Sequence, residues 1–417
     1  MSLQQRCNKK MRKTYFSKIA LAVITILFSG LAGPGSATEG NPFADLEKPA
    51  ATSITVASAK PESGTSSAAF TRYELMSYFK YAAGDTRAHI FHQAAGIEYL
   101  KRFSDAYATR SSFNAQFQLV YEDHSGETGL FSKMHKRGLK TDLHNFYLDV
   151  FQALDTFMSP EARTANLGRY NFRIGRYYLP FGINLQTDTH ATLLQLSNEE
   201  HFGFERDWYA GFYGAVNDNL KYDLYWMLGS GHDAVNKQQD GLVGGRLSLA
   251  GKYLYERGLE GGIAIVNGER LGHAGESTRI QTTRYGLDGR YTRAVTNGTL
   301  KATIETAFGK DDEQNVRSVL GQLEFLDSAR QNGLAMQYRH FRRSNAKDNM
   351  MMMMGNMSHK NGSDASLFLE YTRYLHNDIS GNRLEWVKFL LEKPTETREM
   401  SKNARDLRLT VQYYSYF

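Results

Sequence analysis

The chain has 417 residues, of which 41% are hydrophobic and 12% aromatic, and its mean hydropathy is −0.49. After residue 31 no apolar stretch is long enough to cross a bilayer as a helix, which excludes a helical membrane protein. The formal net charge is +6, but six basic residues and no acidic residue fall within residues 1–37. The other 44 Lys and Arg residues balance the 44 Asp and Glu residues. The composition therefore gives no support for nucleic-acid binding.

The amino-terminal segment predicts export. A basic region precedes an apolar run of about 13 residues over 19–31, and small residues follow at 33–37, which is the layout of a signal peptide cleaved after Ala37. A transmembrane anchor would need roughly 20 apolar residues. The chain's one cysteine, Cys7, lies in this segment. The mature chain is therefore expected to hold no disulfide, thiolate metal site or covalent haem.

Residues 38–70 are rich in Ala, Ser, Thr, Pro and Gly, which predicts a flexible periplasmic segment. From residue 71 onward the chain divides into stretches with period-two alternation. In the last of them Leu407, Leu409 and Val411 share one face, while Arg408 and Thr410 share the other. A strand separates two such sets, whereas a helix would scatter them. In a transmembrane barrel only alternate residues face lipid, which explains how abundant Tyr and Phe coexist with low mean hydropathy.

The predicted fold is all-β: a transmembrane antiparallel β-barrel over residues 71–417, with about 16 strands and a range of 14–18, in the outer membrane of a Gram-negative bacterium. The expected strands are 71–82, 87–103, 111–123, 141–153, 166–178, 206–216, 219–230, 241–251, 257–267, 279–293, 298–308, 316–326, 331–342, 364–376, 382–391 and 404–417.

Both termini of such barrels are periplasmic, so long connections should be external and should alternate with short periplasmic turns. The expected external loops include Gly268–Thr278, Gly309–Asn315, Arg343–Ser363 and Glu392–Asn403. The connection near residues 155–165 is longer than a periplasmic turn should be.

The carboxyl-terminal run Leu409–Phe417 resembles the last strand of Gram-negative outer-membrane proteins, which the barrel assembly machinery recognises. That resemblance implies an assembly role for the terminal Phe417. The stretch Gly168–Gly182, continuing to Trp208–Gly211, is similar to a region of porins related to the phosphate-selective class. This second resemblance implies a sixteen-stranded, trimeric channel. Phosphate-selective members carry a dense ladder of basic residues, whereas here basic residues alternate with acids.

Leu179–Glu205, about 27 residues long, is the strongest functional candidate. It contains Leu193, Leu194 and Leu196, which suggest burial, and it ends in acids at Glu199 and Glu200. It could fold into the barrel and narrow it, or it could pack on the external rim or at a subunit contact. The sequence leaves both interpretations open.

Alternation assigns a set of charged side chains to the lumen, because an Arg or Lys facing lipid near the midplane would cost on the order of 2–4 kcal/mol. They could create a transverse field that orients solutes, or they could fill the barrel as solvated ion pairs. The predicted pore-lining residues are Arg169, Arg173, Lys221, Asp223, Arg246, Arg284, Asp288, Arg290, Lys301, Glu305, Arg339, Glu370 and Arg408.

The run Met350–Met354, with Met357 and His359, offers thioether and imidazole groups suited to Cu(I). Five consecutive methionines fix no coordination geometry, so we expect a low-complexity external loop and no metal or other cofactor. Common motifs of hydrolases, phosphate-binding loops and metalloproteases are absent, and we expect no enzyme.

The sequence therefore predicts a porin for passive diffusion of small hydrophilic solutes or ions. The alternative is a barrel that sheathes a partner protein, such as the barrel of a porin–cytochrome conduit. Expected partners are outer-membrane lipid, the barrel assembly machinery and further copies of the chain in a homotrimer, but not nucleic acid.

Overall fold

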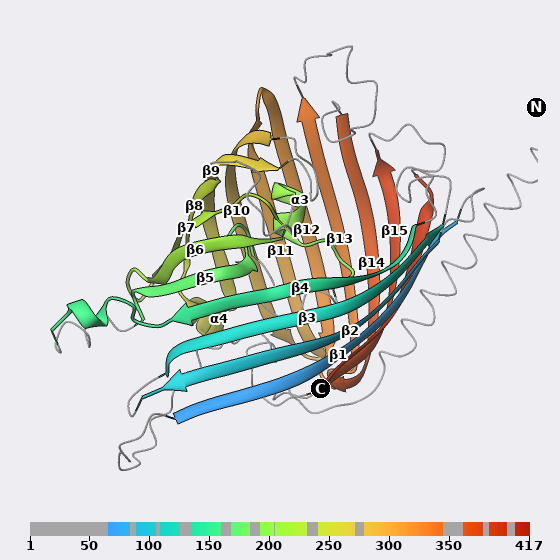
Figure 1. Cartoon of the computed structure of the whole chain (residues 1–417). Helices are drawn as coiled ribbons and strands as arrows, with labels where there is room; N and C mark the ends of the chain where they lie inside the picture. Colours follow the sequence, from blue (N-terminus) through green and yellow to red (C-terminus); the bar gives the residue numbers. More distant parts are fainter. Residues whose placement is uncertain are drawn as a thin grey trace, which may run out of the picture. The chain divides into compact units, whose positions relative to one another are not determined.

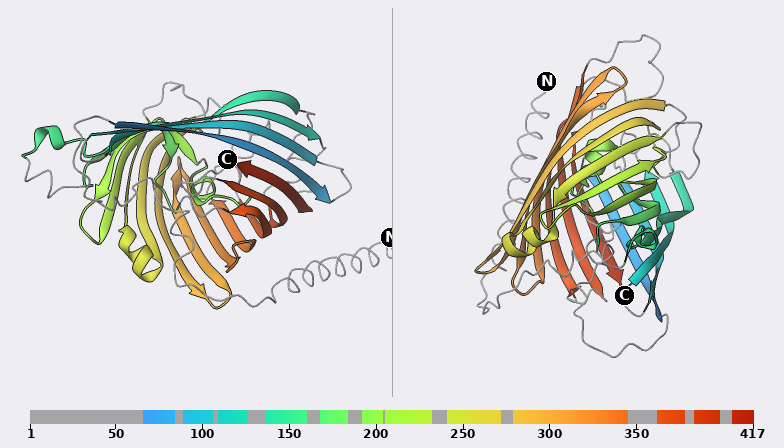
Figure 2. Two further views of the ribbon diagram at one scale, coloured as in Figure 1. Left: turned by 90° about the horizontal axis from the view of Figure 1, so that it is seen from below. Right: turned by 90° about the vertical axis from the view of Figure 1, so that its left-hand side faces the viewer.

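The computed structural model describes residues 66–83, 89–105, 109–125, 136–159, 168–183, 192–203, 205–231, 241–271, 279–344, 362–377, 383–397 and 405–417. Sixteen strands pair antiparallel, each with its neighbours in sequence, and β1 pairs with β16 to close a barrel (Figure 1). Figure 2 shows the strands curving round to meet. The predicted fold class and strand number are confirmed.

The strands are β1 Ser66–Ala83, β2 His89–Ser104, β3 Thr109–Ser125, β4 Lys136–Val150, β5 Asn171–Tyr178, β6 Arg206–Ala215, β7 Leu220–Met227, β8 Leu242–Leu249, β9 Leu259–Leu271, β10 Arg279–Val295, β11 Gly298–Asp311, β12 Gln314–Asp327, β13 Asn332–Ser344, β14 Gly362–Asn377, β15 Leu384–Glu396 and β16 Leu407–Tyr416. A short helix, α3 Ser197–Phe202, precedes β6, and α4 Gly251–Arg257 joins β8 to β9. Among the described residues no helix is long and apolar enough to cross a membrane.

Several predicted boundaries were wrong. β4 ends at Val150 and β5 begins only at Asn171, so residues 151–153 and 168–170 are not strand. The break follows from Gln152, whose φ of 54° is incompatible with an extended strand. The connection between β4 and β5 is indeed long, and it contains the 3₁₀ turn η1 Asp155–Phe157. At the amino-terminal end of the barrel, β1 begins at Ser66, within the segment 38–70 that the sequence predicted to be flexible.

The external ends of several strands also run further than expected. β9, β11, β13 and β15 extend into the predicted loops at Gly268–Thr278, Gly309–Asn315, Arg343–Ser363 and Glu392–Asn403. Between β11 and β12 only Asp312 and Glu313 remain as a turn. Strand pairing thus continues past the stretches whose alternation was clear in the sequence.

Alternation sorts the side chains of each strand between two environments. On β10, Tyr285 and Leu287 are 43% and 55% exposed, whereas Arg284, Asp288 and Arg290 are buried on the opposite face. The outward face is an exposed apolar belt suited to lipid, and closure pairs the first strand with the last. This architecture is that of a transmembrane barrel of the outer membrane, as the sequence predicted.

Side chains fill much of the lumen along β5–β9. The buried cluster there comprises Tyr177, Tyr178, Leu179, Phe181, Phe202, Tyr209, Tyr225, Met227, Leu242, Ala264, Val266 and Ala307. Glycine permits this density: a Cβ atom on Gly244 would lie 2.4 Å from the ring of Tyr225. The side of the lumen lined by β5–β9 therefore holds a packed core.

Candidate functional site in the barrel lumen

The segment Leu179–Glu205 joins β5 to β6, and its described residues lie against the inward faces of other strands. Its helix α3 contacts β11, β12 and β13, and it lies within the ring of strands (Figure 1). Of the two arrangements that the sequence left open, the described residues show the one in which the segment folds into the barrel.

The first anchor of the segment lies just after β5. Phe181 is fully buried and packs where a Cβ atom on Gly286 would lie 2.9 Å from its ring. Two residues later the backbone amide of Ile183 donates a hydrogen bond of 2.9 Å to Oε2 of Glu305. The absence of a side chain at Gly286 therefore lets the segment approach the wall of β10 closely.

The second anchor reaches β13, β14 and β15. Leu194 packs with Ala335, Phe368 and Leu390. The carbonyl oxygen of the next residue, Gln195, accepts a hydrogen bond of 3.0 Å from Nε2 of Gln337. Its side-chain oxygen accepts a second bond from the guanidinium of Arg339. Apolar packing and hydrogen bonds thus fix the same two residues.

The third anchor is α3. Nδ1 of His201 lies 2.5 Å from Oγ of Ser318, and the His201 carbonyl accepts a bond of 3.2 Å from Nε of Arg284. Burial and the adjacent Arg284 charge lower the pKa of His201 to about 3, because both disfavour the imidazolium. His201 is therefore neutral at physiological pH.

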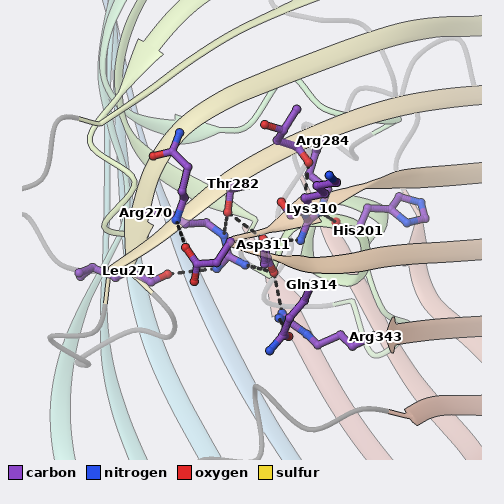
Figure 3. A network of polar contacts seen from close by, with 12 residues as sticks. His201, Arg270, Leu271, Thr282, Arg284, Lys310, Asp311, Gln314 and Arg343 are labelled. Atoms are coloured by element: carbon purple, nitrogen blue, oxygen red, sulfur yellow. Dashed lines mark hydrogen bonds and ion pairs between the residues drawn. The ribbon is translucent and has the colours of Figure 1, made fainter. Parts of the chain in front are cut away.

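Arg284 belongs to a buried network centred on Asp311, the last residue of β11 (Figure 3). The two carboxylate oxygens lie 2.8 Å from Arg284, 3.1 Å from Arg270 and 2.8 Å from Arg343. The hydroxyl of Thr282 also donates to Asp311, over 2.8 Å. One carboxylate thus joins three strands besides its own, next to the point where α3 docks.

A cavity of about 110 Å³ lies between the segment and β10–β15. Charged side chains of both signs line it. The basic ones are Arg290 and Lys388, and the acidic ones are Glu305, Glu324 and Glu370. Nζ of Lys388 lies 3.2 Å from Oε1 of Glu370. Paired opposite charges therefore face the segment across the cavity.

The predicted lumen residues divide between two places. Arg284, Glu305 and Arg339 contact the segment, and Arg290 and Glu370 line the cavity beside it. Four further predicted cations do not themselves line the cavity, and each pairs with a carboxylate: Lys301 with the cavity-lining Glu324 at 3.1 Å, Arg408 with Glu392 at 2.6 Å, Arg246 with Asp288, and Arg173 with Asp149 at 2.6 Å.

Four further predicted residues have positions or surroundings that the sequence did not specify. Arg173 is enclosed by tyrosines, with its guanidinium carbon 3.7 Å from the ring centre of Tyr177. Arg169 lies in a turn before β5, whereas the predicted strand 166–178 had placed it on a strand. Lys221 and Asp223 lie on β7, and Asp223 is partly buried.

Sequence reasoning missed the centres of the two largest ion-pair clusters. Asp311, Arg270, Arg343 and Glu392 all fell in predicted external loops. Glu392 lies 2.9 Å from Lys80, 2.6 Å from Arg408 and 3.8 Å from Arg339. Continued alternation was the available signal, because Asp311 follows Ala307 and Gly309 at even spacing.

Phe417 follows β16 and remains paired with β1. Its amide donates to the Tyr73 carbonyl over 3.0 Å, and the Tyr73 amide donates back over 2.7 Å. Residues 1–65, which include the predicted signal peptide, lie outside the described residues, as do the methionine run at Met350–Met354 with Met357 and His359 and the side chains of Glu199 and Glu200. Within the described ranges no cluster of three or more His, Cys, Asp or Glu side chains could hold a metal ion.

No protein-family model and no curated protein matches the sequence. Solved structures do. OmpF of Salmonella typhi, in a complex with daunomycin, is 12% identical with a TM-score of 0.52, covering 84% of this chain and 97% of that one. OprB of Pseudomonas putida at low pH is 9% identical with a TM-score of 0.50, covering 84% and 92%. These similarities confirm, at the level of the fold, the resemblance to outer-membrane porins.

Proposed function

We propose that this protein is a passive channel for small hydrophilic solutes or ions across the outer membrane, and that Leu179–Glu205 forms its constriction. The observation that carries the proposal is the docking of this segment at three separate places on the inward wall. A barrel of sixteen strands encloses an aqueous lumen unless something fills it. A loop fixed inside such a barrel narrows the passage.

The charges beside the segment support the same function. Arg290, Lys388, Glu305 and Glu370 line the cavity that borders the segment. A wall with fixed charges of both signs stays hydrated and acts on permeating ions through its field. Such a wall suits polar solutes and would repel apolar ones.

The sheath alternative receives less support. A partner protein inside the barrel would need the space that the segment and the β5–β9 core occupy. The segment also engages Gln337 and Arg339 of the inward wall, which bind Gln195. The porin fold additionally supports the homotrimer that the sequence resemblance implied.

Replacing Thr192–Leu196 with the same number of Gly and Ser residues tests the constriction. The change removes the Leu194 and Gln195 anchors and leaves Phe181 and α3 in place. We expect a larger single-channel conductance in a planar bilayer, with the barrel still folded by its heat-dependent shift on gels. An unchanged conductance would place the narrowest point elsewhere, and no defined conductance in either protein would favour the sheath.

A second arm tests the charges. Replacing Arg290 and Lys388 with Gln should shift the reversal potential toward cation preference, and the shift should shrink at high salt because the wall charges are screened. Arg317→Gln is the matched control, because Arg317 is exposed on β12 away from the lumen. An equal shift in the control would contradict a role for the cavity charges.

A further inference from the structure

A second pocket lies on the outward face of the barrel. Its walls are Leu154, Tyr170, Phe212, Tyr222 and Leu224, and its volume is about 420 Å³. Phe212 on β6 and Leu224 on β7 are direct neighbours in the sheet and are 39% and 60% exposed. Their strand neighbours Gly211 and Tyr225 are buried on the inward side. The pocket therefore opens toward the lipid-facing surface and not toward the lumen.

The connection between β4 and β5 contributes Leu154 and Tyr170 to the wall of this pocket, and several bonds fix it there. The amide of Ala153 donates to the carbonyl of Tyr170 over 2.7 Å, and the amide of Gln152 donates to Oδ1 of Asn171 over 3.1 Å. Arg110 on β3 lies 3.2 Å from the carboxylate of Asp155. Leu154 is thus held above the sheet by its own neighbours on both sides.

The pocket presents hydrocarbon to its interior. Among its lining side chains, Tyr222 directs its hydroxyl to the carbonyl of Arg169, over 2.8 Å. Water needs two or more polar partners to stay in a cavity, and apolar cavities remain dry. An empty pocket would leave the lining atoms without dispersion contacts on one side. A hydrocarbon chain needs no polar partner and supplies the missing dispersion contacts. It is therefore the occupant that fits this pocket on a surface surrounded by lipid.

The pocket's position identifies the source of that chain. It lies at the start of β5 and β7 and the end of β6, the barrel end that carries the short turn 216–219 and the carboxyl terminus. This end is periplasmic in barrels of this class, and the periplasmic leaflet of the outer membrane is built of phospholipid.

We infer that the pocket binds an acyl chain of a phospholipid from the periplasmic leaflet. Moving a chain from bulk lipid into the pocket brings no hydrophobic gain, because both surroundings are apolar. Retention depends instead on close packing against the preformed wall that Leu154 and the side chains of β6 and β7 provide. The lipid bound there should exchange more slowly than the lipid around the rest of the barrel.

Native mass spectrometry of the full barrel, extracted in mild detergent and then mixed with phosphatidylethanolamine, tests the inference. Wild-type protein should retain one phospholipid through detergent washing. Leu224→Trp places an indole in the recess and should lower the retained fraction by about tenfold, because the chain loses its packing contacts. Leu154→Ala should also lower it, and this position lies outside the strands, so barrel folding is spared.

Leu287→Trp is the matched control, since Leu287 is an exposed outward residue of β10 remote from the pocket. It should retain lipid as wild type does. Unchanged retention in both pocket variants, or an equal loss in the control, would overturn the inference. A retained species with the mass of lipid A would refute the assignment to phospholipid.

Discussion

Asp311 shows how one residue can determine the position of several others. Its carboxylate and the three guanidiniums of Arg270, Arg284 and Arg343 are all buried, so neither sign of charge is well solvated alone. A buried ion pair contributes little compared with apolar packing, but removing one partner leaves an uncompensated charge. Here three like charges would be left facing one another.

We therefore expect Asp311→Asn to lower the free energy of unfolding by about 3–5 kcal/mol, the range seen when one partner of a buried ion pair is lost. The urea midpoint of the folded gel band, in a fixed detergent, measures the change. Asp312→Asn is the control: Asp312 is exposed in the adjacent turn, and Asn preserves the oxygen that accepts from the Gln281 amide. Equal midpoints for the two variants would show that the network does not stabilise the barrel.

The sequence carried a signal for the side of the sheet on which Asp311 lies, but none for its partners. Asp311 and Glu313 lie within the predicted loop Gly309–Asn315 and look like ordinary polar loop residues. Arg284 was assigned to the lumen because it alternates with Tyr285 and Leu287, but its role in holding α3 depends on a carboxylate 27 residues away. Alternation gives the side of the sheet on which a residue lies, and it says nothing about which residue on another strand will pair with it.

At the scale of elements, the inserted segment Leu179–Glu205 docks with the imidazole of His201 in its neutral form. The pKa of His201 is about 3 in the docked segment, against 6.5 for a solvated histidine. An undocked segment therefore binds a proton more readily than a docked one. Docking is fully favoured above pH 6.5 and weakens as the pH falls from 6.5 toward 3.

We expect the wild-type channel to show additional high-conductance openings as the pH falls below about 5. The reason is that the free energy of docking weakens by at most about 1.4 kcal/mol for each pH unit. His201→Asn can still bond Ser318 and does not titrate, so its openings should not depend on pH in this way. Planar-bilayer recordings of both proteins at constant salt make the comparison. Identical pH profiles would mean that carboxylates, and not His201, govern any change.

The strands were far easier to predict than the segment between them. β10 and β11 carry long, regular alternation, because each has one face in lipid and one in the lumen. Leu179–Glu205 lacks such a period, and its three leucines are equally compatible with a rim contact. Its inward course depends on Gly286 and Phe368, positions that are informative only once the strands are assembled.

At the scale of the whole molecule, the barrel depends on a single seam between its two ends. β1 and β16 pair from Glu74–Tyr416 to Ala83–Leu407, and Phe417 extends the pairing by one residue to Tyr73. The rings of Tyr73 and Phe417 lie 6.1 Å apart, and Phe417 is 48% exposed on the outward side. The terminal residue thus contributes both backbone bonds and an aromatic group at the lipid boundary.

Deleting Phe417 should lower the folded fraction in the membrane several-fold, because the seam loses two hydrogen bonds and the assembly signal loses its aromatic end. Phe417→Tyr keeps both and should fold as wild type does. Heat-dependent gel mobility of outer-membrane fractions reports the folded fraction in vivo. A normal folded fraction after the deletion would show that the terminal residue is dispensable for assembly.

The architecture could be predicted because the bilayer imposes one rule on every strand, whereas the lumen imposes no common rule on its side chains. Arg173 illustrates the difference. Its inward side followed from alternation, but the tyrosines of β4–β6 that enclose it could be identified only from the closed barrel.

The three docking points of the inserted segment also dictate an order of events. Its contacts span 122 residues from Ile183 to Glu305, 144 from Gln195 to Arg339 and 117 from His201 to Ser318. The groups that receive the segment lie on β11, β12 and β13, so it can dock at all three places only once these strands lie side by side. Until then the barrel lacks the proposed constriction, and the width of the passage is set by the docking of the segment as well as by the pairing of the strands.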